Sequence, residues 1–130
     1  MKLAKGTKLQ NYIIIEAIGE GGMGEVYLAE ETLLGRQVAI KRLNPLLTED
    51  PQFSERFINE ARIQAKLLHP NIVALHNFFI ENEVYYMVME YASGITLKQM
   101  ILSTGPIPEH RTLKIFGQLI SALTYAHDKR

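Results

Sequence analysis

The chain has 130 residues, with 14 basic against 14 acidic residues, and 47% of them are hydrophobic. This apolar content excludes an intrinsically disordered chain, and the zero formal net charge argues against a nucleic-acid-binding protein. The sequence has no cysteine, which excludes disulfides and thiolate metal sites and is compatible with the cytoplasmic location that we expect. No apolar run is long enough to cross a membrane, so we expect no membrane segment in this chain.

Short β-branched segments predict the sheet. Residues 11–18, 25–30 and 37–42 are candidate strands with no helical pattern between them, which predicts an antiparallel meander rather than a βαβ unit. Two further strands are predicted over residues 72–80 and 84–90. The expected fold class is therefore α+β, with a five-stranded antiparallel sheet and one main helix beside it.

That main helix is predicted between the third and fourth strands. Asp50 is a candidate N-cap, and Pro51 suits the first helical position. Apolar residues then recur at helical spacing as far as about Leu68. The helix should stop there because His69 precedes Pro70, and a residue before proline is disfavoured in the α region.

Two more helices are predicted near the end of the sequence. Thr96-Leu-Lys-Gln99 resembles a capping box that opens a short helix ending near Gly105, and Pro108-Glu109 begins a longer one. The longer helix shows no stop signal and has no later element to cover its apolar stripe. We therefore expect the chain to be part of a longer protein, and we expect it either to self-associate through the helix at 109–130 or to fold this helix back onto its own lobe. The stripe consists of Phe116, Leu119, Ile120 and Leu123.

A glycine-rich segment lies between the first two strands. Gly19-Glu-Gly-Gly-Met-Gly24-Glu-Val26 matches the pattern G-x-G-x-x-G-x-V, which on its own also fits a flexible hairpin turn. A Rossmann loop requires a helix after its glycines, whereas a strand is predicted here. A Walker loop requires Lys-Ser/Thr after its last glycine, whereas Gly24 is followed by Glu25. A glycine hairpin folded over phosphate groups remains, because its backbone can approach oxygens closely and offer N–H donors.

A cation near such a turn can be supplied by the third strand. Alternation places Ala39 and Lys41 on one face of this strand, so that the small Ala39 leaves room for a flat ring. The lysine needs a partner if its charge is to be desolvated. Glu60, between Phe57 and Ala61 on the inner side of the main helix, is the best candidate, and an ordinary surface ion pair is the alternative interpretation.

Five motifs, named below in chain order, together resemble the N-terminal lobe of eukaryotic-type protein kinases. Their residues are most similar to those of bacterial serine/threonine protein kinases. The resemblance divides the chain into an N-terminal extension at 1–10, an ATP-binding kinase N-lobe at 11–92, and the hinge exit with the start of a truncated C-lobe at 93–130. The motifs are Gly19–Val26, Val38–Lys41, Glu60, His69–Val73 and Met87–Tyr91.

The resemblance implies ATP as the cofactor and assigns roles to individual residues. Lys41 would hold the α- and β-phosphates and pair with Glu60, which makes these two the catalytic residues present. Ile18, Val26 and Ala39 would enclose the adenine, with Met89 at the gatekeeper position. The complete implied cofactor-binding set is Ile18, Gly19, Glu20, Gly21, Gly22, Met23, Gly24, Val26, Ala39, Lys41, Met89, Glu90, Tyr91 and Ala92.

The family's catalytic loop and its Asp-Phe-Gly metal-binding motif are absent from these residues. The resemblance therefore implies that the parent protein is an ATP-dependent serine/threonine kinase acting on protein substrates with Mg²⁺, whose ligands lie outside this chain. We expect no metal site here and no phosphoryl transfer by the chain alone. A pseudokinase-like scaffold is the alternative function, and an unrelated antiparallel nucleotide-binding module is a third hypothesis. The four histidines have no metal-binding spacing and are expected to be structural or exposed: His69, His76, His110 and His127.

Overall fold

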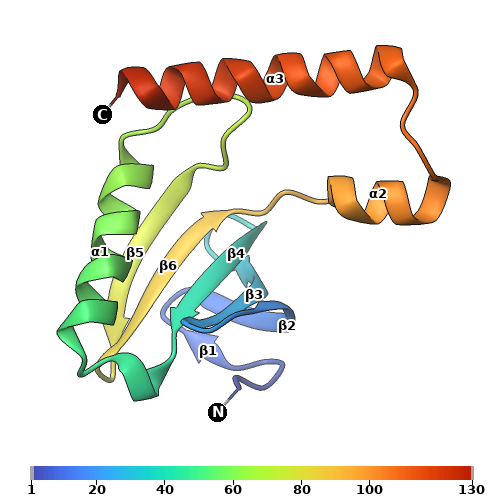
Figure 1. Cartoon of the computed structure of the whole chain (residues 1–130). Coiled ribbons are helices and arrows are strands. Elements are labelled where there is room, and N and C mark those ends of the chain that lie inside the picture. The colour runs from blue at the N-terminus through green and yellow to red at the C-terminus, as the bar shows by residue number, and fades with distance from the viewer. Residues whose placement is uncertain (1, 130) are drawn as a thin grey trace. The chain divides into compact units, whose positions relative to one another are not determined.

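The computed structural model describes residues 2–129, which divide into two compact units (Figure 1). The first unit comprises the chain up to residue 66 together with residues 74–91, and it contains the whole sheet. The second unit comprises residues 67–73 and the chain from residue 92 onward. Each unit is described by itself.

The first unit is a six-stranded sheet in which every pair of neighbouring strands is antiparallel. The antiparallel arrangement confirms the prediction, and the strand count of five was wrong. In spatial order the strands are β1 (Lys8–Leu9), β2 (Tyr12–Glu20), β3 (Gly24–Glu31), β4 (Arg36–Leu43), β6 (Val84–Glu90) and β5 (Leu75–Glu81).

The additional strand lies in the segment that was expected to be an N-terminal extension. In β1, Lys8 pairs with Ile13 and Leu9 with Tyr12, around a turn in which Gln10 has a φ of 51°. Two further hydrogen bonds attach the residues before β1 to β2. The Gly6 N–H donates to the Ile14 carbonyl, and the Ile14 N–H donates to the Thr7 carbonyl. A two-residue strand is too short to show alternation, so the sequence carried no periodic signal for it.

Helix α1 (Pro51–Ala65) follows a short 3-10 helix at Pro45–Leu47 and lies alongside β5 (Figure 1). The Asp50 side chain accepts a hydrogen bond from the Gln52 N–H, which confirms the predicted N-cap. The helix ends at Ala65 rather than near Leu68, since Lys66 closes it and the chain from Leu67 to Val73 enters the second unit.

One face of the sheet encloses an aromatic and aliphatic core. The sheet curls so far that Tyr12 in β2 stacks on Phe79 in β5, with ring centroids 5.9 Å apart, and Phe79 stacks on Tyr86 at 4.9 Å. The Asn77 side-chain amide donates to the Tyr12 hydroxyl at 3.2 Å across the same curl. The remaining members of this core are Leu9, Ile14, Tyr27, Ala29, Val38, Ile40 and Val88.

The other face of the sheet packs against α1. Phe57 and Ala61 of the helix are buried with Leu43 of β4 and Met87 of β6. Full burial of a side chain as large as Phe57 stabilises the fold by about 1.5–3 kcal/mol. The position of α1 on this face is therefore fixed chiefly by apolar packing.

The second unit contains α2 (Leu97–Thr104) and α3 (Glu109–Asp128). The capping box predicted for α2 is present: the Thr96 hydroxyl accepts from the Gln99 N–H, and the Gln99 side chain accepts from the Thr96 N–H. Gly105 ends this helix with a φ of 82°, a conformation that favours glycine.

The loop at residues 67–73 is attached to α3 by hydrogen bonds. The Tyr125 hydroxyl accepts from the Leu68 N–H at 2.8 Å, and the Asn71 side chain donates to the Gln118 carbonyl at 3.1 Å. The His69 ring accepts from the Asn71 N–H through Nδ1, so that Nε2 can donate to the Ser121 hydroxyl 3.1 Å away. His69 is thus a structural residue of this unit, as expected.

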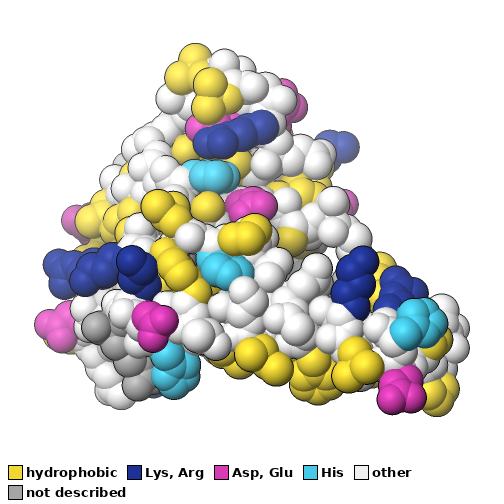
Figure 2. All heavy atoms as spheres, turned by 90° about the horizontal axis from the view of Figure 1, so that it is seen from above, with side chains coloured by type: hydrophobic (Ala, Val, Ile, Leu, Met, Phe, Trp, Pro, Cys, Tyr) yellow, Lys and Arg dark blue, Asp and Glu magenta, His cyan; other side chains and the backbone are white. Residues whose placement is uncertain are grey.

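Helix α3 leaves its predicted apolar stripe open to solvent. The four side chains are about half exposed, and Figure 2, which looks down on this helix, shows hydrophobic side chains in a row along its flank. The exposed fractions are 52% for Phe116, 49% for Leu119, 58% for Ile120 and 53% for Leu123. Within residues 2–129 no helix combines the length and apolar character needed to cross a membrane.

The glycine segment contains two glycines that should respond oppositely to substitution. A Cβ atom on Gly24 would lie 1.8 Å from the Arg42 carbonyl oxygen, whereas one on Gly22 would meet no atom within 4 Å. Gly24→Ala must separate β3 from the end of β4, and we expect it to lower the free energy of unfolding by more than about 2 kcal/mol. Gly22→Ala is the matched control and should stay within about 0.5 kcal/mol of the wild type. Urea unfolding of both variants measures the difference, and equal effects would contradict the close approach at Gly24.

Candidate functional site

The glycine segment forms a tight turn between β2 and β3. Gly19 pairs with Val26 and Glu20 with Glu25, and the Gly21 N–H closes the turn by donating to the Gly24 carbonyl at 2.8 Å. The tip of the turn is open, since a Cβ on Gly21 or Gly22 would contact nothing within 4 Å. The chain therefore has an exposed backbone segment that a ligand could approach closely.

Strand register brings several predicted site residues to one face of the sheet. Val26 lies opposite Lys41 in the β3–β4 ladder, and Ala39 lies opposite Met89 in the β4–β6 ladder. Alternation places these four side chains on the same side as α1. Two residues on this face were missed, Leu28 opposite Ala39 and Met87 opposite Lys41, because only the observed register reveals them.

Lys41 and Glu60 are in direct contact. The Lys41 ammonium donates to Glu60 Oε1 at 2.9 Å, which joins β4 to α1. Glu60 is carried to this place by its neighbours Phe57 and Ala61, which are buried against the sheet. The two side chains are 27% and 44% exposed, so water screens the pair, and it contributes less than about 1 kcal/mol to stability. The ion pair therefore matters less for stability than for placing a charged group beside Val26 and Ala39.

The other predicted cofactor residues lie at the ends of strands. Ile18 is in β2 and 43% exposed, while Met23 is part of the turn and packs against the α1-side core. Glu90 ends β6, where its N–H donates to the Ala74 carbonyl at 2.8 Å and its carboxylate accepts from the Ala74 N–H at 3.1 Å. Tyr91 follows directly, and Ala92 belongs to the second unit.

A buried polar cluster, which was missed from the sequence, lies on the opposite face of β3 and β4. Glu25 and Arg42 are each 8% exposed, and the guanidinium donates to Glu25 Oε1 at 3.2 Å. The Tyr27 hydroxyl donates to the same oxygen at 3.0 Å. Burial raises the pKa of Tyr27, and the neighbouring Glu25 raises it further. The signal that could have revealed this cluster is the alternation that puts Glu25 and Arg42 opposite the face of Lys41.

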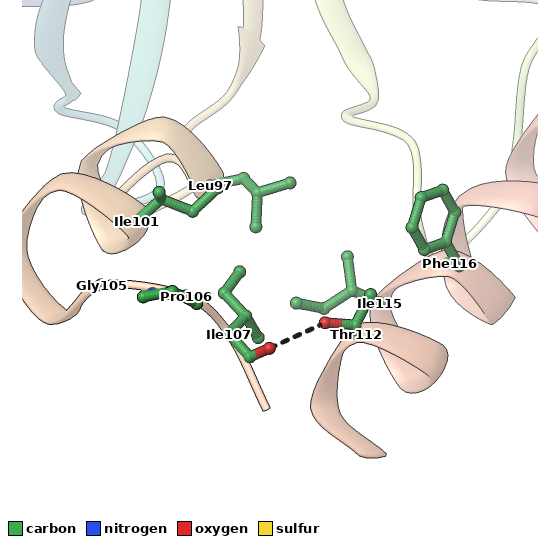
Figure 3. A pocket seen from close by; sticks show the side chains of 8 residues that line it. All are labelled: Leu97, Ile101, Gly105, Pro106, Ile107, Thr112, Ile115 and Phe116. Carbon is green, nitrogen blue, oxygen red and sulfur yellow. Dashed lines mark hydrogen bonds between the residues drawn. The ribbon is translucent and has the colours of Figure 1, made fainter. Parts of the chain in front are cut away.

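An apolar hollow of about 440 Å³ lies in the second unit between α2 and α3. Figure 3 shows Leu97 and Ile101 from α2 facing Ile115 and Phe116 from α3, with the Thr112 hydroxyl donating to the Ile107 carbonyl at 3.4 Å. No titratable side chain lines the hollow. It therefore offers apolar contact and no acid–base chemistry.

The described residues fit a phosphate group better than a metal. Lys41 supplies a cation, and the open backbone at Gly22 would let a phosphate oxygen approach the turn closely. Within residues 2–129, no three or more His, Asp or Glu side chains gather in a way that could hold a metal ion. We therefore assign no metal ligand among these residues.

Comparison with known proteins gives the family. A sequence model of the protein kinase domain matches residues 12–130. The serine/threonine-protein kinase PrkC of Bacillus subtilis is 44% identical over 119 residues, which are 92% of this chain and 18% of PrkC. The serine/threonine-protein kinase PknD of Chlamydia pneumoniae is 35% identical over 132 residues, covering 93% of this chain and 14% of PknD. The chain thus spans less than a fifth of the length of these relatives.

Solved structures agree with this assignment. The crystal structure of the PknI kinase domain of Mycobacterium tuberculosis superposes with a TM-score of 0.80 at 31% identity, covering 98% of this chain and 51% of that one. Both the curled antiparallel sheet and the following helices therefore resemble those of a solved bacterial kinase domain. This chain belongs to the protein kinase domain family.

Proposed function

We propose that this chain is the ATP-binding part of a serine/threonine protein kinase that transfers the γ-phosphate of ATP to hydroxyl groups of proteins. The observation that carries the proposal is the 2.9 Å contact between Lys41 and Glu60 on the sheet face that also holds Val26 and Ala39. Because the chain spans less than a fifth of the curated relatives above, transfer would be a property of a longer protein that contains it.

The glycine turn would bind the phosphates through its backbone. The Gly21 N–H already donates to the Gly24 carbonyl, so the open backbone at Gly22 is where phosphate oxygens would approach without meeting a side chain. Glu20, Met23 and Gly24 complete the turn, whose ends are held by β2 and β3. The turn would thus cover the phosphates while its ends remain attached to the sheet.

Lys41 would bind the α- and β-phosphates, and Glu60 would orient it. A lysine side chain has four rotatable bonds, and the contact with Glu60 restricts where its ammonium can lie. ATP supplies the phosphoryl group that is transferred, while Lys41 stabilises negative charge on the group left behind. The catalytic role of both residues therefore depends on their contact.

The adenine would lie on the apolar part of the same face. Val26 and Ala39, together with Ile18 at the end of β2, offer apolar side chains and no competing charge. Met89 stands opposite Ala39 and would limit the depth of the site. The Glu90 N–H already donates to Ala74, so hydrogen bonds to the adenine edge would come from other backbone groups at Glu90, Tyr91 and Ala92.

Lys41→Met tests the phosphate role in the longest protein that contains this chain. Methionine keeps most of the unbranched apolar side chain and removes the cation, so we expect transfer of labelled γ-phosphate to a general protein substrate to fall at least about 100-fold. Lys8→Met in β1 is the control, a lysine of the same sheet that lies outside the site, and should keep wild-type activity. Undiminished transfer by Lys41→Met would refute the assignment. A wild-type protein that binds ATP without transferring phosphate would support the scaffold alternative.

Glu60→Gln tests the orienting role separately from stability. Because the ion pair is partly exposed, its loss should change the free energy of unfolding by less than about 1 kcal/mol. The rate of transfer should nevertheless fall about tenfold or more, since Lys41 is no longer held in one position. Glu55→Gln on the same helix is the matched control. A loss of stability that accounts for the whole loss of activity would show that Glu60 serves only the fold.

The exposed stripe on α3 favours self-association of the chain. Four half-exposed apolar side chains in one row form the kind of patch that monomeric proteins seldom leave bare. Replacing Leu119 and Leu123 together by glutamine should shift sedimentation of the chain toward the monomer. Leu102→Gln, at a leucine of α2 that is 76% exposed and lies outside the stripe, is the control and should leave the distribution unchanged. A wild-type chain that sediments as a monomer at all concentrations would disprove self-association.

A further inference from the structure

The polar cluster of Glu25, Tyr27 and Arg42 lies directly behind the proposed phosphate site. Glu25 is the residue between Gly24 and Val26, and Arg42 is the residue after Lys41. The two are paired with each other in the β3–β4 ladder, and they project from the face opposite Lys41. Any shift of the Glu25–Arg42 pair must therefore move the end of the glycine turn or the lysine.

The cluster is buried and its hydrogen bonds converge on one carboxylate. Glu25 Oε1 accepts from the Arg42 guanidinium at 3.2 Å and from the Tyr27 hydroxyl at 3.0 Å. Arg42 also hydrogen-bonds the Tyr86 hydroxyl, which ties the cluster to β6. A buried ion pair of this kind is costly to desolvate, and apolar side chains of similar volume often give equal or greater stability. Stability alone is therefore a poor explanation for charged residues at these positions.

The N-terminal segment, which here means Lys2 and Leu3 ahead of β1, is attached to the same cluster. The Leu3 N–H donates to the Tyr27 hydroxyl at 2.9 Å, and Leu3 packs against the core of the curled sheet. Lys2 forms an exposed ion pair with Glu20, at the start of the glycine turn, with 3.3 Å between the charged atoms. The segment thus contacts both strands that carry the turn, although β1 itself pairs only with β2.

The Glu25–Arg42 ion pair also bears on the strand register near the turn. The β2–β3 ladder has irregularities between Ile14 and Glu16 and between Ala17 and Gly19, so its pairing is interrupted shortly before the turn. The β3–β4 ladder is regular, and a slip of one residue in it would move Lys41 to the wrong face. An ion pair between directly opposite residues opposes that slip, because a slipped register would separate two buried charges.

We propose that Glu25, Tyr27 and Arg42 are positioning residues that fix the glycine turn over the site, and that the N-terminal segment supports them through Leu3. The effect on ATP rests on the proposed function, whereas the effect on the turn does not. The geometry also makes Lys2 and Leu3 part of the support of the site rather than of a separate extension.

The test replaces the cluster by apolar residues in one variant, Glu25→Leu with Tyr27→Phe and Arg42→Leu. We expect an unfolding midpoint in urea that is unchanged or higher, since no buried charge is left unpaired. Hydrogen exchange without nucleotide should nevertheless be about tenfold faster at the two amides that report on the turn. These are the Gly21 N–H, which donates to Gly24, and the Asn44 N–H, which donates to the Met23 carbonyl at 2.7 Å.

A second ion pair in the same ladder provides the matched control. Glu31 and Arg36 are directly opposite at the far end of β3 and β4, with 2.6 Å between Oε1 and Nε. Replacing both by leucine should leave exchange at the glycine turn unchanged. The Gly35 N–H, which donates to the Glu31 carbonyl, reports on that end of the hairpin and should not respond to the cluster variant.

The outcomes separate the inference from the proposed function. Unchanged exchange at Gly21 and Asn44, or equal acceleration at Gly35, would overturn the positioning role and leave the cluster a purely structural one. If the cluster variant does not fold, Tyr27→Phe replaces it, because this change removes only the hydroxyl between Leu3 and Glu25. The positioning role is then tested by the same comparison of exchange at the three amides. Titration with ATP should show about tenfold weaker binding by the variant that accelerates exchange at the turn. Failure of the wild type to bind ATP would refute the proposed function, while the exchange data would still decide the inference.

Discussion

Every residue from Gly24 to Glu31 is paired with a residue between Arg36 and Leu43, and the two faces of this ladder have different environments. One face carries Tyr27, Val38 and Ile40 into the curl of the sheet, where all three are completely buried. The other carries Val26 and Lys41 toward α1. Because side chains alternate, burial of the first set forces the second set onto the opposite side. Packing in the core thereby determines which residues are available to a ligand.

Helix α1 packs on this ladder and contributes Glu60 to the candidate site. Phe57 and Ala61 bury themselves against Leu43 and Met87, and that packing is far stronger than a partly exposed ion pair. Glu60 reaches Lys41 because its neighbours in the helix are anchored. The contact between the two charges is therefore a consequence of the helix position, and a small movement of the helix would change the contact with little change in stability.

Much of this arrangement could be predicted from local sequence signals, and the exceptions have physical reasons. The caps at Asp50 and Thr96 and the β-branched segments identified the main helix, the short helix and the longer strands. Strand β1 was missed because its two residues are held by pairing with Ile13 and Tyr12 rather than by any pattern of their own. The buried Glu25–Arg42 pair was missed for a different reason. Charged residues are seldom buried, so a sequence alone suggests exposure until the strand register shows that each has a partner.

The glycine turn has open space at its tip and close packing at its end on β3. Gly22 has open space around it, whereas Gly24 is pressed against the Arg42 carbonyl so closely that no side chain fits. The Asn44 N–H adds a second link by donating to the Met23 carbonyl. One contact ends on Arg42 near the end of β4, and the other ends on Asn44, which directly follows β4. Both therefore hold the Gly24 end of the turn close to the strand that carries Lys41. The β2 ladder is interrupted at two places whereas the β4 ladder is continuous, so the pairing with β4 is the more regular attachment of the turn.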